Sequence, residues 1–352
     1  MKVLYLTKYT SAGASSRMRS FQYFPYLENS DLKISVSTFF NDRYLETLYN
    51  GNKNSMLILK AYLKRFFVLF TVFRYDRVVI EYEIFPYFPA WIEKFLSKLG
   101  IKYIVDYDDA IFHNYDLNAN KWIKKLLGNK IDQVMKFSSV VVAGNQYLAK
   151  RAKIAGAKKI IIIPTVIDLK EYKTKRDYES KKFRIGWIGS PSTYKYVENI
   201  KKGLTAFANQ RDAEIVIVGA FTQHKSEPPF VFVPWQKHTE TQWIRSFDVG
   251  LMPLDDTPWS RGKCSFKLIQ YMAAGIPVIA SPVGMNKEVV TERNGFLANS
   301  SEEWYNSLSE YAENVSLRKK HGVEGRKIVE KKYALQVTAE AWKQLLMNNG
   351  NI

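Results

Sequence analysis

The chain has 352 residues, a length that suits two domains of ordinary size better than one. Because hydrophobic residues make up 46% of it and aromatic residues 14%, it can bury sizeable cores, and a globally disordered chain is excluded. The 52 Lys and Arg residues exceed the 34 Asp and Glu residues, and the formal charge of +18 favours an anionic partner, with a Lys-rich surface that only keeps the protein in solution as the alternative.

Short runs rich in β-branched residues alternate with longer mixed segments through the first half. Each separation is long enough for a helix, as parallel strands joined by crossovers require. The runs are almost continuously apolar, which suits strands that are covered on both faces. The strands predicted here span residues 2–8, 32–39, 76–83, 101–108, 139–145 and 159–165.

The second half repeats this pattern, and a polar, charged segment separates the two halves. We interpret that segment, residues 166–183, as an interdomain linker. The sequence therefore predicts two doubly wound α/β domains that face each other across a cleft. Ligands of such sheets bind beyond the carboxyl ends of the strands, so the chemistry is expected there. The strands predicted in the second half span residues 183–189, 213–220, 230–235, 248–254, 276–281 and 295–298.

The segment WSRGKCSFKLIQYMAAGIPVIASPVG (259–284) carries the sharpest local signal. Ser265 suits the N-cap of the helix that follows it, and Gly275 suits the C′ position that closes this helix. A loop with Arg261, Lys263 and Ser265 would bring cations and backbone amides to a helix N-terminus, an arrangement fit for a diphosphate. A capped helix between two strands, without a ligand, is the alternative, since every α/β protein contains several.

That segment resembles the donor-binding signature of the retaining glycosyltransferases of family four, whose fold is called GT-B. The stretches on either side of it agree, and GWIGSPSTYKYV (186–197) looks like the turn that opens the family's C-terminal domain. In the N-terminal half, GASSRMRSFQYFPYL (13–27), IVDYDDAIFH (104–113) and GNQYLAKRA (144–152) resemble a bacterial polysaccharide-assembly branch of the family. The resemblance thus extends over nearly the whole chain.

The resemblance implies a GT-B fold, with two Rossmann-like, doubly wound parallel-sheet domains facing each other across a cleft. The acceptor-side domain would comprise residues 1–168 and a C-terminal helix at about 331–352, and the donor-binding domain residues 169–330. Around that helix, apolar residues recur at steps of three to five. They predict a buried stripe of Ile328, Val329, Tyr333, Val337, Ala341 and Leu345.

The implied activity is transfer of a glycosyl unit from a nucleotide-diphosphate sugar to a glycan or lipid-linked acceptor, with retention of the anomeric configuration. The implied setting is bacterial surface polysaccharide synthesis, such as capsule or O-antigen. The nucleotide sugar is a substrate, so no cofactor is expected. We also expect no metal, because no His/Cys cluster has metal-ligand spacing and GT-B enzymes stabilise the leaving diphosphate with cations and helix amides.

Donor-binding residues are carried over from the family by register. The family's usual Glu-x7-Glu pair falls on Gly262 and Gln270, and Gln270 keeps only an amide for ribose hydroxyls. We interpret this departure as variation within a Lys-rich branch. For Arg17 a solvated surface position is the alternative, and for Trp235 a place in the core. The donor-binding set expected here is Gly13, Ala14, Ser15, Arg17, Gly189, Ser190, Val233, Trp235, Arg261, Lys263, Cys264, Ser265, Phe266 and Gln270.

Candidate catalytic residues come from an acidic strand end and from two lysines. Asp106, Asp108 and Asp109 follow one another closely, and a strand end offers no stability reason to collect three repelling acids. By register, Asp109 and then Asp108 lie closest to a histidine that helps to hold the donor sugar in relatives. We expect them to activate the acceptor or to orient the sugar, with capping of the next helix as the alternative. Lys195 and Lys267, against plain surface lysines, are the cations expected at the leaving diphosphate.

Three features bear on the compartment. The opening MKVLYLTKYT enters a strand pattern at once, which predicts no signal peptide, and Cys264 is the only cysteine, which fits a reducing compartment. The segments 56–74 and 85–100 combine apolar residues with cations, and such helices can lie in a lipid interface. A pair of helices that cover the core is the alternative. We expect a cytoplasmic protein, with a peripheral position on the inner membrane as the option that these segments raise.

Three other functions compete with this one. A sugar-nucleotide epimerase or a glycan phosphorylase would share the fold, but epimerases lack a block of the 259–284 type. A nucleic-acid-binding protein is suggested by the charge alone and would need a reader module or a basic stripe with stacking aromatics. We recognise neither and predict no nucleic-acid partner. A catalytically impaired GT-B scaffold is suggested by the two missing glutamates.

Overall fold

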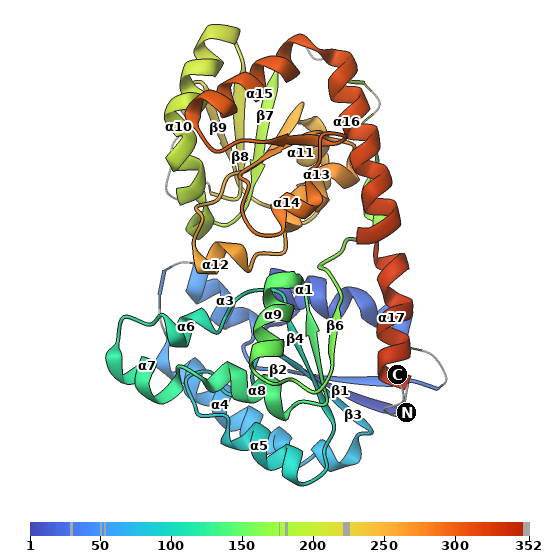
Figure 1. The fold of residues 1–352 in the computed structure, drawn as a ribbon. Coiled ribbons are helices and arrows are strands. Elements are labelled where there is room, and N and C mark those ends of the chain that lie inside the picture. The colour runs from blue at the N-terminus through green and yellow to red at the C-terminus, as the bar shows by residue number, and fades with distance from the viewer. Residues whose placement is uncertain are drawn as a thin grey trace. The chain divides into compact units, whose positions relative to one another are not determined.

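The computed structural model of the chain divides into two compact units, which are described here one at a time (Figure 1). Unit 1 consists of Met1–Val166, Gly262–Cys264 and Thr338–Ile352, and unit 2 of Ile167–Arg261 and Ser265–Val337. The structure describes residues 1–28, 31–49, 51–52, 54–175, 177–179, 182–220 and 226–347.

Unit 1 is built on a six-stranded sheet in which all neighbours are parallel. The strand order is β2-β1-β3-β4-β5-β6. Every strand predicted in the first half forms, because each run is long enough and apolar enough to be covered on both faces. The strands are β1 (Lys2–Thr7), β2 (Lys33–Thr38), β3 (Arg77–Glu81), β4 (Tyr103–Tyr107), β5 (Val140–Ala143) and β6 (Ile160–Ile162).

Helices surround this sheet (Figure 1), and several begin at an asparagine. The side chains of Asn54, Asn120 and Asn145 each accept a hydrogen bond from a backbone amide in the first turn, which satisfies one otherwise unpaired donor. The helices are α1 (Ala14–Arg19), η1 (Phe21–Tyr23), α2 (Phe24–Leu27), α3 (Asp42–Tyr49), α4 (Ser55–Leu69), η2 (Val72–Arg74), α5 (Trp91–Lys98), α6 (His113–Asp116), α7 (Lys121–Leu127), α8 (Lys130–Phe137) and α9 (Gln146–Ile154).

Unit 2 contains a second six-stranded parallel sheet, in the order β12-β11-β10-β7-β8-β9. Every strand predicted in the second half forms, so the prediction of two doubly wound parallel sheets is confirmed. The strands are β7 (Arg184–Ile188), β8 (Glu214–Val218), β9 (Phe230–Val233), β10 (Val249–Met252), β11 (Val278–Ala280) and β12 (Gly295–Leu297).

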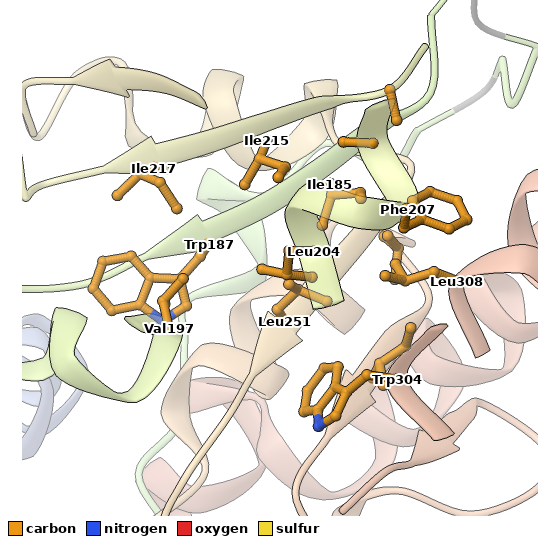
Figure 2. Close-up of a cluster of buried hydrophobic side chains, with 14 of the residues drawn as sticks. Ile185, Trp187, Val197, Leu204, Phe207, Ile215, Ile217, Leu251, Trp304 and Leu308 are labelled. Atoms are coloured by element: carbon orange, nitrogen blue, oxygen red, sulfur yellow. The ribbon is translucent and has the colours of Figure 1, made fainter. Parts of the chain in front are cut away.

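The helices of unit 2 cover its sheet, and Figure 2 shows part of the resulting core. Leu204 and Phe207 of α10 and Trp304 of α15 pack with Ile215 and Leu251 of the sheet, and all five side chains are buried. The helices are η3 (Leu169–Glu171), α10 (Pro191–Arg211), α11 (Glu240–Ser246), α12 (Pro258–Arg261), α13 (Phe266–Ala273), α14 (Asn286–Val289), α15 (Ser301–Glu313), α16 (Val315–Ile328) and the π-helix η5 (Val329–Tyr333).

The segment between the two sheets, predicted as a polar linker, contains residues that are buried and hydrogen-bonded. Val166 and Ile167 are buried, and Ile167 forms a bridge with Ala334 within unit 2. The Tyr178 hydroxyl donates a hydrogen bond to the Gly275 carbonyl. Of the predicted linker 166–183, residues 176 and 180–181 lie outside the described part of the chain. Its described aromatic residues pack as part of a domain because their apolar rings are worth more buried than exposed.

The C-terminal helix α17 (Leu335–Met347) corrects the predicted stripe. Val329, Tyr333 and Leu345 are buried as predicted, but Val337 and Ala341 are exposed. The π-helical turn holds more residues than an α-helical turn, and Ala334 is extended, so the 3.6-residue period does not continue across them. Within unit 1, Thr338 forms a hydrogen bond of 2.8 Å with the Tyr23 hydroxyl, and Trp342 packs on the Tyr23 ring.

Candidate functional site

The acids predicted as a group at the end of β4 have three separate environments in unit 1. Asp106 is buried and forms an ion pair with Arg19, whose Nε lies 2.9 Å from Oδ2. Arg19 also donates a hydrogen bond of 2.8 Å to the Ile163 carbonyl. Burial raises the pKa of Asp106, although Arg19 opposes the shift. The expectation that no stability reason places an acid here is therefore wrong for Asp106, which joins α1 to the sheet.

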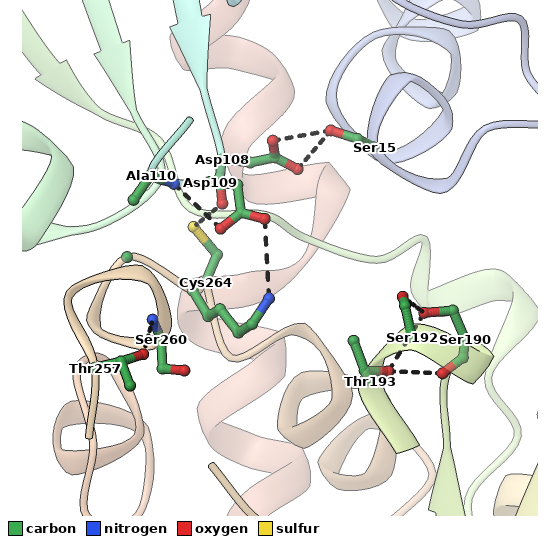
Figure 3. Close-up of polar contacts among 12 residues, drawn as sticks. Ser15, Asp108, Asp109, Ala110, Ser190, Ser192, Thr193, Thr257, Ser260 and Cys264 are labelled. Atoms are coloured by element: carbon green, nitrogen blue, oxygen red, sulfur yellow. Dashed lines mark hydrogen bonds and ion pairs between the residues drawn. The ribbon is translucent and has the colours of Figure 1, made fainter. Parts of the chain in front are cut away.

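Asp108 accepts hydrogen bonds from two hydroxyl groups, as Figure 3 shows for Ser15. The Ser15 Oγ lies 2.8 Å and 2.7 Å from the two carboxylate oxygens, and the Tyr82 hydroxyl also donates to Asp108. Tyr82 has a φ of 66°, a left-handed conformation that is costly for a bulky residue. Backbone strain of this kind is often found at functional sites, because the surrounding structure must maintain it.

Asp109 lies beside a lysine instead of capping a helix. Its Oδ1 accepts a hydrogen bond of 3.1 Å from the Ala110 amide, and its Oδ2 lies 3.9 Å from the Lys263 ammonium. Burial raises the pKa of Asp109, and Lys263 opposes this shift. The next helix, α6, has Phe112 as its N-cap and no side-chain capping bond, so the capping alternative is wrong.

Residues missed by the sequence interpretation complete this strand edge. The Ser16 hydroxyl donates to both carboxylate oxygens of Glu81, and the Lys8 amide donates to it at 3.1 Å. Burial raises the pKa of Glu81 to about 7. Glu81 is the last residue of β3, which pairs with β4, and Tyr82 follows it. The signal in the sequence that could have identified Glu81 was a polar residue at the carboxyl end of an apolar run.

Gly13 and the helix α1 that follows it hold the remaining donor-binding candidates of unit 1. Gly13 is the N-cap of α1, and a Cβ at this position would lie 2.5 Å from the Tyr9 Cβ. Ala14 is exposed, whereas Arg17 is half-buried and its amide donates to the Gly13 carbonyl. The structure thus explains why Gly13 is needed, through its close approach to Tyr9.

The tripeptide Gly262–Cys264 belongs to unit 1 and is fixed by Asn145. The Asn145 amide donates to the carbonyls of Gly262 and Lys263 at 2.8 Å and 3.2 Å. A Cβ at Gly262 would lie 2.4 Å from the Ala110 Cβ. In this arrangement a glutamate cannot occupy the position of the family's first Glu, so the departure at Gly262 follows from packing.

Cys264 and the cations of this loop each have a protein partner within their own unit. The buried Cys264 thiol donates to the Asp108 carbonyl at 3.1 Å, and burial raises its pKa, so it is a packing residue and not a reactive one (Figure 3). Arg261 forms an exposed ion pair with Asp256. Lys263 lies next to Asp109 in unit 1, whereas Arg261 and α13 belong to unit 2, so the predicted convergence of Arg261 and Lys263 on the N-terminus of α13 stays a prediction.

Ser265 is the N-cap residue of α13, but its side chain does not cap the helix. Its φ of 51° is left-handed, and its hydroxyl donates a hydrogen bond of 2.7 Å to Asn286. This backbone conformation turns the hydroxyl away from the first-turn amides, which an extended N-cap residue would reach. Phe266 begins the helix and is half-buried, and Gly275, with a φ of 74°, closes it as predicted.

In unit 2, the turn after β7 and the start of α13 meet. A Cβ at Gly189 would lie 2.6 Å from the Trp187 ring and 2.8 Å from the Lys267 Cε. The Lys267 ammonium lies 5.6 Å from the centre of the Trp187 ring. Gly189 was predicted to bind the donor, but its amide donates a hydrogen bond to the Val218 carbonyl. This amide is therefore not available to a phosphate. Gly189 instead lets Lys267 approach the turn.

The N-terminus of α10 follows directly. Ser190 is its N-cap and Pro191 its first residue, and the Ser190 hydroxyl contacts Ser192 at 3.0 Å (Figure 3). A helix of 21 residues presents a partial positive charge at this end. Lys195 is exposed on the next turn, with its ammonium 5.2 Å from the Tyr196 ring. The turn at the carboxyl end of β7 therefore combines the nearby Lys267 with the N-terminus of α10, an arrangement suited to a phosphate.

Two further turns lie beside this one. Gly219, which follows β8, has a φ of 97°, and a Cβ there would lie 2.3 Å from the Gly189 carbonyl and 3.4 Å from the Trp235 Cβ. Val233 ends β9 and is half-buried, and Trp235 is partly exposed, which excludes the core alternative for its ring. The three turns that follow β7, β8 and β9 thus form one continuous edge.

Glu240, which sequence interpretation missed, links Trp235 to Gln270. The Trp235 indole donates to one carboxylate oxygen, and the Gln270 amide donates to the other at 2.8 Å. Gln270 also donates to the Tyr172 hydroxyl at 3.0 Å. Gln270 is buried, so the amide predicted to reach a ribose has protein partners. No local pattern marks Glu240 as a partner of Gln270, because the two residues are 30 positions apart.

Within the described residues, no group of three or more His, Cys, Asp and Glu side chains could hold a metal ion. Asp106 and Asp108, which match a bare Asp-x-Asp pattern, have different partners. Asp106 binds Arg19, and Asp108 accepts hydroxyl hydrogen bonds.

Comparison with known proteins supports the fold. Residues 182–314 match a family described as "Glycosyl transferases group 1". Sucrose-phosphate synthase from Thermosynechococcus elongatus has a TM-score of 0.74 at 15% identity, covering 98% of each chain. Anabaena HepE in complex with UDP-glucose has a TM-score of 0.72 at 16% identity, covering 98% of this chain and 99% of that one. The comparison with curated proteins found no match.

A third solved structure agrees with these two. The apo form of WaaB, a lipopolysaccharide outer core galactosyltransferase, has a TM-score of 0.65 at 13% identity, covering 97% of this chain and 100% of that one. The chain therefore has the GT-B fold of two Rossmann-like domains, and its residues 182–314 are similar to the group 1 glycosyltransferases.

Proposed function

We propose that this chain, with its GT-B fold and its similarity to the group 1 glycosyltransferases, is a retaining glycosyltransferase that uses a nucleoside-diphosphate sugar. Its acceptor would be a glycan or lipid-linked saccharide in bacterial surface polysaccharide synthesis. The single observation that carries the proposal is the approach of Lys267 to the turn between β7 and the N-terminus of α10. Two sources of positive charge at one strand edge suit the diphosphate of such a donor.

The edge of unit 1 supports the acceptor half of the reaction. Asp109 is a half-buried carboxylate with a raised pKa, and Asp108 is oriented by Ser15 and Tyr82. Carboxylates held in this way can accept hydrogen bonds from sugar hydroxyls. We assign Asp109 to the hydroxyl that reacts and Asp108 to the orientation of a sugar ring.

The proposed chemistry needs no covalent enzyme intermediate. The acceptor oxygen bonds to the anomeric carbon on the face from which the diphosphate departs, and the bond between that carbon and the phosphate oxygen breaks. The departing diphosphate takes the proton of the acceptor hydroxyl. Lys267 and the α10 N-terminus stabilise the negative charge that develops on it. The anomeric configuration is therefore retained, which NMR of the product can check.

The direct test is transfer from a panel of nucleoside-diphosphate sugars, measured as release of nucleoside diphosphate. Turnover with at least one donor is expected. A catalytically impaired scaffold is the second candidate, since Gly262 has no room for a glutamate and Gln270 is held by Glu240. Nucleotide binding without turnover of any donor would favour the scaffold, and absence of both would contradict the proposed function.

Replacement of Lys267 with Met should weaken the binding of uridine diphosphate, our probe nucleotide, by about 10- to 150-fold. This is the factor expected for loss of a charge-assisted contact of about 1.5–3 kcal/mol. Methionine keeps an apolar stem next to Gly189, so the turn should stay packed. Calorimetry measures the effect, with Lys202→Met on the exposed side of α10 as the control. Equal affinities of Lys267→Met and the wild type would remove Lys267 from the site.

Turnover should continue after chelator treatment. The positive charges of Lys267 and of the α10 N-terminus supply the stabilisation that a metal supplies in other transferases. The measurement is the initial rate with EDTA, then with added manganese or magnesium. A rate abolished by EDTA and restored by either ion would show that the reaction depends on a metal.

A further inference from the structure

Helix α4 in unit 1 exposes large apolar side chains and buries an arginine, the reverse of the usual arrangement. Its exposed side carries Leu59, Leu63, Phe67 and Phe70, which recur at steps of four and three and so lie on one face. Its buried side carries Arg65, whose guanidinium donates to the carbonyls at the ends of β1 and β2. A surface helix of a soluble domain normally places its apolar residues toward the core.

Helix α5 continues this exposed apolar surface. Trp91 and Phe95 are one turn apart and exposed, and Phe67, Phe70 and Trp91 are each 66% exposed. A chain of ring contacts joins the two helices, from Tyr62 to Phe85 at 5.6 Å and onward through Phe88 to Trp91 at 5.8 Å. Figure 1 shows α4 and α5 at the outside of unit 1. We call Leu59, Leu63, Phe67, Phe70, Trp91 and Phe95 the α4–α5 face.

The exposed charges on these two helices all have one sign. Lys60 and Lys64 lie on α4, and Lys94 and Lys98 on α5, and all four are exposed. Helix α4 has no acidic residue, and Glu93, the only acid of α5, is buried and accepts a hydrogen bond from the Ile84 amide. An apolar face with lysines and no exposed acid is complementary to a negatively charged, apolar partner.

We infer that the α4–α5 face binds the surface of an anionic phospholipid bilayer. The aromatic and leucine side chains would enter the boundary between headgroups and acyl chains, and the lysines would extend their charges to lipid phosphates. A second copy of this chain is disfavoured, because equivalent lysines would face each other. No helix among the described residues has the length and apolarity to cross a bilayer. The inference does not rest on the proposed function.

The full chain should float with vesicles of phosphatidylcholine and phosphatidylglycerol, and bind much less to phosphatidylcholine alone. Phe67→Ser together with Phe70→Ser should weaken binding at least about tenfold, because two large apolar side chains no longer enter the lipid. Lys60→Ala and Lys64→Ala should each weaken it about fivefold, and less at high salt. Ile154→Ser is the matched control, since Ile154 is 82% exposed at the end of α9 and does not belong to the α4–α5 face.

Three results would overturn the inference. The first is no binding to phosphatidylglycerol vesicles, and the second is equal binding by the control and the Phe67/Phe70 variant. The third is lipid-free self-association, seen by sedimentation velocity, that the Phe67/Phe70 variant loses, because the face would then bind a second copy. Circular dichroism checks that each variant is folded. Loss of glycosyl transfer with vesicle binding intact would count against the proposed function alone.

Discussion

Replacement of Arg19 with Leu should lower the free energy of unfolding of unit 1 by about 3–5 kcal/mol, because it leaves Asp106 buried without its charged partner. Both side chains are almost fully buried, so water cannot replace the lost interaction. Urea denaturation followed by circular dichroism measures the change. Arg43→Ala, at an exposed position on α3, should change stability by no more than about 0.5 kcal/mol.

A double variant separates the ion pair from the packing. Arg19→Leu combined with Asp106→Leu fills the same region with apolar groups and should recover most of the loss, since no buried charge remains. Without Arg19, the folded-state pKa of Asp106 should rise further above its unfolded value. The single variant should therefore be least destabilised at low pH, where Asp106 is protonated in both states. Its loss of stability should grow as pH rises and Asp106 must ionise. A loss that is the same at every pH would assign the effect to packing.

The two sheets could be predicted from the sequence because a parallel strand buried on both faces has a local signature. Runs such as 139–145 and 213–220 are apolar almost without interruption, and β5 and β8 form inside them. The turns between them had local signals as well. Gly275 closes α13 as a left-handed residue, in the place where glycine ends many helices.

The details of the candidate site depend on contacts that no local pattern contains. Arg19 and Asp106 are 87 residues apart, so the reason for an acid inside β4 appears only when α1 packs on the sheet. Ser265 has the composition of a capping residue, but its left-handed backbone sends the hydroxyl to Asn286. For Glu240, too, the partner Gln270 lies 30 residues away.

The reversed polarity of α4 shows a different limit. Its composition of leucines, phenylalanines and lysines fits either a core-covering helix or one that faces outward. The choice is made by Arg65, which finds two carbonyl acceptors at the sheet edge and fixes the rotation of the helix. A buried guanidinium with such partners is tolerated, whereas one without them is not. The outward direction of Phe67 and Phe70 follows from that rotation.

Asp109→Asn should lower kcat by about 10- to 150-fold, the factor expected for loss of a charge-assisted hydrogen bond of about 1.5–3 kcal/mol to the hydroxyl that reacts. The substitution keeps the size of the side chain and its hydrogen bond from the Ala110 amide, and removes the charge. Loss of the contact with Lys263, at 3.9 Å and partly exposed, should cost at most about 1 kcal/mol of stability. Affinity for uridine diphosphate should stay nearly unchanged, because the proposed diphosphate contacts come from Lys267 and α10.

The pH profile supplies an independent measurement. A carboxylate that must be ionised to act gives an acidic limb, on which activity is lost as pH falls through its pKa. Because burial raises the pKa of Asp109, this limb should lie at a higher pH than for an ordinary aspartate. The Asn variant should lack it in kcat/KM. A variant that keeps both the wild-type rate and the acidic limb would move the acceptor-activating role to another carboxylate, with Asp108 and Glu81 as the next to replace.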